Sequence, residues 1–146
     1  MKKLIAALLP LVLVTPGIAY SAQPGQTLGT CMSDSLNGKE RKELAKWVYF
    51  AMSTHSSIEP YSKVSDKDRE ASNRYVGALI SRLLTEDCPE VAKQAYESDG
   101  LQAFETGFGI VGEVAMQELM NEASVAQALG AFEQYLDQSQ FDKIFN

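Results

Sequence analysis

The chain has 146 residues, of which 13 are Lys or Arg and 19 are Asp or Glu, giving a net charge of −6. This length allows one modest domain and excludes large architectures such as a TIM barrel or a two-domain dehydrogenase. The excess of acid argues against a nucleic-acid partner, because neutralising phosphates requires an excess of Lys and Arg.

The N-terminal segment has the order of a signal peptide. Two lysines precede an apolar run, Leu4–Val14, and small residues follow it. Cleavage after Ala19 and cleavage after Ser21 both satisfy the small-residue rule, so the site stays open. The apolar run has 11 residues, whereas about 20 are needed to span a bilayer. We therefore predict export to the periplasm, removal of residues 1–22 and no stable membrane insertion afterwards.

The mature chain is more acidic than the precursor. Removing residues 1–22 leaves 11 basic and 19 acidic residues, a net charge of −8. Residues 23–30 are polar and contain Gly and Pro, which predicts a flexible leader. We assign residues 31–146 to one helical domain.

The mature chain contains two cysteines, Cys31 and Cys88. Exported chains mature in an oxidising compartment, where such a pair is predicted to form a disulfide. Cysteines this far apart form neither a Cys-x-x-Cys redox motif nor a zinc-ligand set. The sequence predicts no metal and no cofactor.

Hydrophobic residues recur at helical spacing through most of the mature chain. Asn37 with Glu40, and Ser65 with Asp68, have the spacing of helix-capping pairs. Pro89 is typical of a first helical position, and Asp99-Gly100 interrupts the pattern. The expected helices are Gly38 to about Ser56, Asp66–Thr85, Pro89 to about Ser98, Leu101–Met120, and Val125 to about Gln138 with Ser124 as its cap. We expect the tail residues Phe141, Ile144 and Phe145 to dock as a short turn.

These patterns predict an all-α fold. No segment alternates with the period of a strand, and no hairpin signal separates two strand-like runs. We expect a single small domain of four to five helices in a bundle-like or orthogonal arrangement, with one disulfide. Leu101–Met120 is the expected central helix.

The segment Gly107–Gly112 matches the dinucleotide-binding pattern G-x-G-x-x-G. That motif works only at a turn between a strand and a helix, and here it continues a helical stripe. We interpret Gly107, Gly109 and Gly112 instead as positions that let a neighbouring helix approach closely or let their own helix kink.

His55 is the only histidine. A hydrolase would pair it with a flanking hydroxyl or with Glu59, but adjacent helical residues point in divergent directions. We favour a core-facing histidine near a helix C-terminus, and the sequence predicts no catalytic residue.

Tyr49 and Phe50 project away from the apolar stripe of their helix, toward a side that carries charged residues. Exposed aromatic residues mark interaction surfaces. We therefore take Tyr49 and Phe50 as the candidate interaction surface, with coverage by another helix or by the C-terminal tail as the alternative.

Four segments together resemble a group of small exported, disulfide-linked bacterial proteins of uncharacterised function. The segments are 31–47, 50–55, 82–88 and 115–120. The resemblance implies an exported, disulfide-linked chain and no particular activity or ligand.

The leading hypothesis is a periplasmic all-α protein without catalytic activity, which binds another envelope protein or itself. The alternative is an inhibitor or immunity protein whose acidic surface blocks a basic cell-wall hydrolase. An enzyme built around His55 is a third class, disfavoured by the lack of catalytic motifs.

Overall fold

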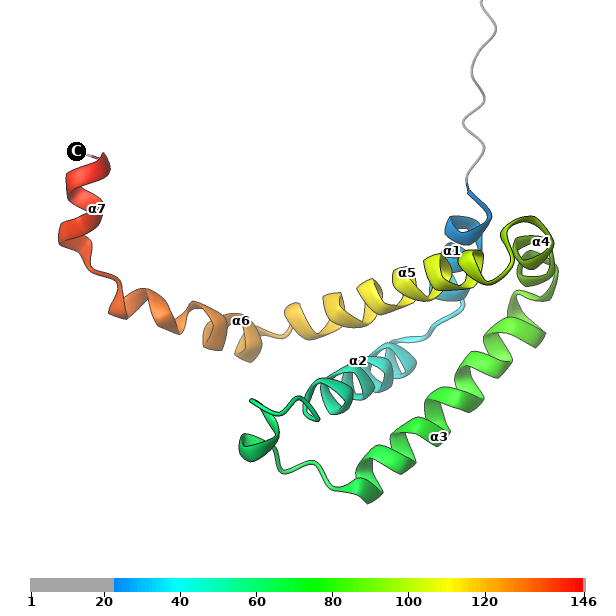
Figure 1. The fold of residues 1–146 in the computed structure, drawn as a ribbon, viewed down its shortest axis with the longest axis horizontal. Coiled ribbons are helices and arrows are strands. Elements are labelled where there is room, and N and C mark those ends of the chain that lie inside the picture. Colours follow the sequence, from blue (N-terminus) through cyan, green and yellow to red (C-terminus); the bar gives the residue numbers. More distant parts are fainter. Residues whose placement is uncertain (1–22, 146) are drawn as a thin grey trace, which may run out of the picture.

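The structure is a computed structural model that describes residues 23–145 (Figure 1). The predicted signal peptide, residues 1–22, lies outside this range. Residues 23–145 contain helical elements and no strand, which confirms the all-α prediction. The elements are α1 (Pro24–Asp34), α2 (Gly38–Met52), the 3-10 turn η1 (Glu59–Tyr61), α3 (Asp66–Arg82), the π-helical turn η2 (Leu83–Asp87), α4 (Pro89–Asp99), α5 (Leu101–Met120), α6 (Ala123–Gly130), the 3-10 turn η3 (Ala131–Tyr135) and α7 (Gln138–Phe145).

The described residues form more α-helices than the four or five expected. One addition is α1, so the prediction of a flexible leader over residues 23–30 is wrong. Leu28 and Met32 of α1 are fully buried, and α1 packs against α4 and α5. The segment is ordered by these tertiary contacts, which outweigh its poor intrinsic helix propensity.

Two glycines let α1 lie very close to α5. A Cβ atom built on Gly25 would lie 2.7 Å from Thr106 Cβ, and one built on Gly29 would lie 2.6 Å from Ile110 Cδ1. Real Cβ atoms do not approach other carbon atoms so closely, so only glycine fits at these two positions.

The G-x-G-x-x-G segment lies inside α5, as expected, and contributes to the same crossing. A Cβ atom on Gly107 would lie 3.2 Å from Leu28 Cγ, which confirms close helix approach at this glycine. Close approach is wrong for Gly109 and Gly112, whose added Cβ atoms would meet no described atom within 4 Å, and the alternative of a helix kink at these two glycines stays a prediction.

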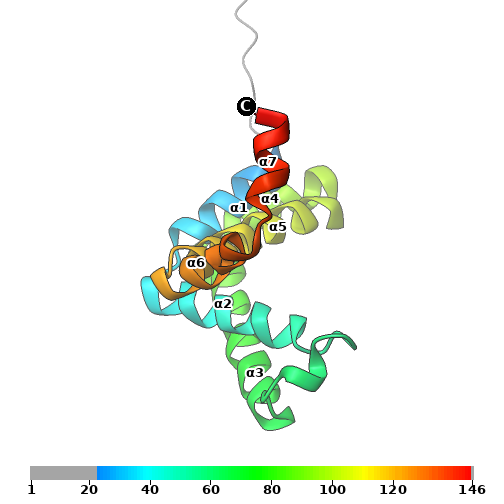
Figure 2. The same cartoon turned by 90° about the vertical axis from the view of Figure 1, so that its left-hand side faces the viewer.

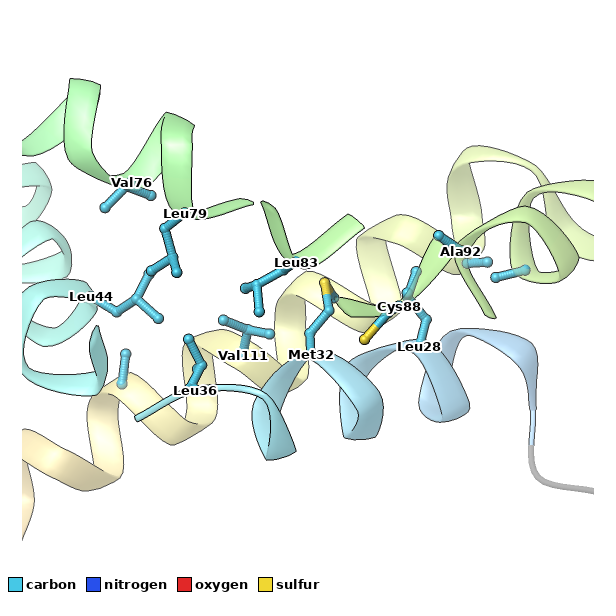
Figure 3. Close-up of a cluster of buried hydrophobic side chains, with 13 residues drawn as sticks. Leu28, Met32, Leu36, Leu44, Val76, Leu79, Leu83, Cys88, Ala92 and Val111 are labelled. Carbon is cyan, nitrogen blue, oxygen red and sulfur yellow. The ribbon is translucent and has the colours of Figure 1, made fainter. Parts of the chain in front are cut away.

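The predicted disulfide between Cys31 and Cys88 is present, with the two Cα atoms 6.1 Å apart. It joins α1 to the residue before α4. Cys88 lies within the main hydrophobic core, as Figure 3 shows, and Cys31 packs against that core. The buried core side chains come from α1 to α5 and the short connections between them. They are Leu28, Met32, Leu36, Leu44, Val76, Leu79, Leu83, Cys88, Ala92, Ala95, Ala103, Val111 and Ala115.

Local capping chemistry sets several helix boundaries. The capping boxes of α2, at Asn37 and Glu40, and of α3, at Ser65 and Asp68, are both formed as predicted. Gly100, with a φ of 58°, separates α4 from α5. The bounds of α5 are those predicted, and it packs against α1, α2 and α4 as the central helix.

The C-terminal segment differs most from expectation. We name Ala123–Phe145 the C-terminal arm. The expected helix Val125–Gln138 is wrong, because α6 begins earlier, ends at Gly130 and has no side-chain cap from Ser124. Docking of the tail is also wrong, because α7 makes no tertiary contact with any other described element. Figure 1 shows the C-terminal arm leaving the end of α5 and running away from the other helices, and in Figure 2 the arm points toward the viewer in front of them.

Candidate interaction surface

Tyr49 and Phe50 lie on adjacent but different faces of α2. Tyr49 is 48% exposed and faces the end of α5, whereas Phe50 is half-buried and faces α3. Their ring centroids are 6.1 Å apart. Adjacent helical residues diverge, so one flat partner surface does not cover both rings. The two predicted residues are therefore close together, but each lines a different hollow of the surface: Tyr49 lines one beside α5, and Phe50 lines one beside α3.

Tyr49 lines a hollow that we name the α2–α5 groove. Its volume is about 360 Å³. One wall is formed by α2, and the other by the end of α5 and the first residues of the C-terminal arm. The lining residues are Lys42, Ala45, Lys46 and Tyr49 on the first wall, and Glu118, Leu119, Glu122 and Val125 on the second.

The two walls of the α2–α5 groove carry opposite charge. We name the α2 side the lysine wall, for Lys42 and Lys46, and the other side the glutamate wall, for Glu118 and Glu122. Lys46 pairs with Glu43 of its own helix, and the two walls form no ion pair with each other in the described structure. The groove therefore presents a positive edge and a negative edge with apolar surface between them.

The wider charge distribution follows the same division. Helix α2 has four basic and two acidic residues, a net charge of +2, although the chain as a whole has a net charge of −6. Residues 94–142 contain nine acidic residues and no Lys or Arg. The end of α5 and most of the C-terminal arm belong to this acidic stretch.

The C-terminal arm exposes apolar side chains along its whole length, and none of its described residues is buried. Phe132 is 61% exposed, Tyr135 81% and Phe145 76%. Leu129, Leu136, Phe141 and Ile144 are also exposed, and Phe141 stacks on Phe145. A folded monomer rarely leaves this much apolar surface uncovered.

Sequence reasoning missed the C-terminal arm because it assigned these side chains to the core. The sequence does contain a feature that argues against a packed helix here. The helical pattern is interrupted at Asn121-Glu122, Gly130 and Asp137. These interruptions divide the region into pieces of five to eight residues, too short to be stable helices without a packing partner.

A second hollow lies between α2, α3 and α5 and is almost entirely apolar. Its volume is about 200 Å³. Gly112 lies at its edge and leaves space that a side chain would occupy. The lining residues are Leu44, Trp47, Val48, Val76, Ile80, Phe108, Val111, Gly112 and Ala115. This hollow is an opening into the core and has no charged residue on its walls.

The expectation that His55 faces the core is wrong. Helix α2 ends at Met52, so His55 lies beyond it in a series of turns and is exposed. Its Nδ1 accepts a hydrogen bond from the Ser57 backbone N–H at 3.2 Å. The Ser53 and Thr54 hydroxyls donate to backbone carbonyls of α2 instead of to the imidazole.

Two carboxyl groups have perturbed pKa values, and both shifts have local causes. The hydrogen bond from the Ser65 hydroxyl holds the pKa of Asp68 below its usual value of 3.8. The Ser139 hydroxyl lowers the pKa of Asp137 in the same way. Both groups stabilise helix starts and lie outside the α2–α5 groove.

Within residues 23–145, no group of three or more His, Cys, Asp and Glu side chains is arranged to hold a metal ion. None of the helices in that range is long and apolar enough to cross a membrane.

Comparison with protein families, with curated proteins and with solved structures found no match to this chain.

Proposed function

We propose that this chain is a small exported protein without catalytic activity that acts by binding protein surfaces through its C-terminal arm. The observation that carries the proposal is the row of uncovered aromatic and aliphatic side chains on the arm. Keeping this much apolar surface in water is unfavourable unless a partner covers it.

The Cys31–Cys88 disulfide supports action outside the cytoplasm, because disulfides persist in oxidising compartments. Together with the signal-peptide pattern of residues 1–22, it favours the periplasm.

The charge of the C-terminal arm favours a protein partner over a bilayer surface. Within Ala123–Phe145 there are three acidic residues and one lysine, a net charge of −2. Anionic lipid headgroups repel such a segment, whereas peripheral membrane helices are rich in Lys and Arg. A protein partner with basic residues around an apolar surface fits better.

Site-specific photo-crosslinking in cells that export the protein tests the proposal. A photoreactive phenylalanine analogue at Phe132 should give protein adducts. The same analogue at Gln94, an exposed position on α4 away from the arm, should give few. Adducts at twice the chain mass would indicate self-association, and other masses would indicate an envelope partner. Absence of adducts from Phe132 and also from Phe141 would contradict the proposal.

A further inference from the structure

We infer that the partner of the C-terminal arm is a second copy of this chain, and that the two copies pair face to face through their α2–α5 grooves. This inference rests on the proposed function and names the partner of the same surface. It follows from three properties of the groove: its paired charges, its apolar lining and its position at the base of the arm.

The charges make the α2–α5 groove complementary to itself. A two-fold axis running along the groove places the lysine wall of each copy opposite the glutamate wall of the other. Lys42 and Lys46 of one copy then face Glu118 and Glu122 of the other, and the reciprocal contact forms at the same time. A heterologous partner would need the same alternation of charge on its own surface.

The apolar residues provide short-range affinity in the same arrangement. Tyr49 and Leu119 lie in the groove, and Val125 begins the C-terminal arm at its edge. Leu129 and Phe132 continue from Val125 at spacings of four and three residues along the arm. When the grooves pair, each arm lies against α2 of the other copy, where Tyr49 is the exposed aromatic anchor.

The arm of the same chain does not fill its own groove. The arm runs away from α2, as Figure 1 shows, and it contacts only α5 among the other α-helices. Each copy thus offers an uncovered arm and an unfilled groove, and two copies satisfy both. Closed pairing also limits assembly to a dimer, because an isologous contact uses the same patch on both chains.

Sedimentation velocity of the purified, disulfide-intact exported chain is the direct test. We expect a dimer that dissociates on dilution and, because the facing charges are solvent-accessible, dissociates further as salt is raised. Tyr49→Ala should raise the dissociation constant at least about tenfold. Phe50→Ala alters the adjacent ring, which faces α3, and should change the dissociation constant less than about twofold.

Charge exchange between the walls gives a sharper result. The first variant, Lys42→Glu with Lys46→Glu, makes both walls acidic. The second, Glu118→Lys with Glu122→Lys, makes both walls basic. Each should sediment as a monomer alone, because like charges face each other. An equimolar mixture should form a heterodimer, because both reciprocal contacts are then between opposite charges. Recovery on mixing also shows that neither variant failed to fold.

A matched control separates groove charge from total charge. Lys63→Glu with Lys93→Glu changes the net charge by the same amount at exposed positions outside the groove, and this variant should still dimerise. Truncation after Met120 removes no described buried residue and should give a folded monomer.

The second-copy inference is wrong if the chain stays monomeric at all concentrations, if mixing restores no heterodimer, or if the truncated chain still dimerises. Strong hydrogen-exchange protection of the arm in a monomer would show instead that it folds back on its own chain. Arm adducts to another protein, together with a monomeric purified chain, would overturn the second copy while leaving the proposed function intact. Absence of both adducts and dimer would overturn both.

Discussion

Gly29 on α1 lies directly against Ile110 on α5. A Cβ atom on Gly29 would be 2.6 Å from Ile110 Cδ1, 2.8 Å from Ile110 Cβ and 3.0 Å from the Gly107 carbonyl oxygen. The last two atoms belong to or adjoin the backbone of α5, so rotation of the isoleucine side chain does not relieve the contact. The closeness of the α1–α5 crossing therefore depends on the missing side chain.

Gly29→Ala should destabilise the protein although alanine has the higher helix propensity. We expect a loss of about 1–3 kcal/mol in the free energy of unfolding, since α1 must move away from α5. Gly109→Ala is the matched control, because the added Cβ atom would meet nothing within 4 Å. It should raise stability by about 0.5–1 kcal/mol. Urea denaturation followed by circular dichroism measures both, and equal effects of the two variants would contradict the close crossing.

The Cys31–Cys88 disulfide connects α1 to α4 across 57 residues of sequence. Cys31→Ala with Cys88→Ala should lower the free energy of unfolding by about 2–4 kcal/mol, mainly because the unfolded chain regains the freedom of an open loop. Urea midpoints with and without a phosphine reductant measure the effect. The reductant should shift the wild-type midpoint and leave that of the double variant unchanged. A wild-type midpoint insensitive to complete reduction would show that the bond adds no stability.

Sequence reasoning succeeded where the signal was local. Asn37 and Ser65 cap α2 and α3, Pro89 begins α4, and Gly100 ends it. Each boundary depends on a hydrogen bond, a fixed backbone angle or a positive φ within a few residues, so a short window of sequence contains the cause.

Sequence reasoning failed where the cause was tertiary. Gly25 and Gly29 suggest flexibility when considered alone, but against α5 they make a close helix crossing possible. Phe132 and Phe141 have the spacing of a packed helix, yet they are exposed. Periodicity identifies the apolar face of a helix and leaves open which surface covers it. The opposite walls of the α2–α5 groove come from distant segments, so their pairing is visible only in the fold.

Glu40 uses its two carboxylate oxygens for different contacts. Oε2 accepts a hydrogen bond from the Asn37 backbone N–H at 3.0 Å, and Oε1 pairs with Arg82 Nη2 at 2.9 Å. Glu40→Gln should keep the capping contact and lose the ion pair, at a cost of about 1 kcal/mol. Glu40→Ala should cost about 2 kcal/mol, because both contacts are lost.

The control for Glu40 is Glu70→Gln, which removes an exposed ion pair to Arg74 within α3. That change should cost less than about 0.5 kcal/mol. Thermal unfolding of the variants at neutral pH provides the measurement. If Glu40→Gln and Glu70→Gln have the same effect, the contact between Glu40 and Arg82 contributes nothing beyond an ordinary surface pair.

The start of α3 should make stability depend on pH in the acid range. The hydrogen bonds that Asp68 accepts from the Ser65 hydroxyl and backbone N–H hold the pKa of Asp68 below 3.8. Because the pKa is lower in the folded state, ionised Asp68 stabilises the fold above the unfolded-state pKa. That stabilisation is lost as the pH falls through the folded-state pKa, below about pH 4.

Ser65→Ala removes the side-chain donor and should raise the pKa of Asp68 toward 3.8, as measured by NMR titration of the carboxyl carbon. Ser139→Ala should instead raise the pKa of Asp137, whose partner it removes, and leave that of Asp68 unchanged. An Asp68 pKa that does not respond to Ser65→Ala would show that the capping hydrogen bond is absent in solution.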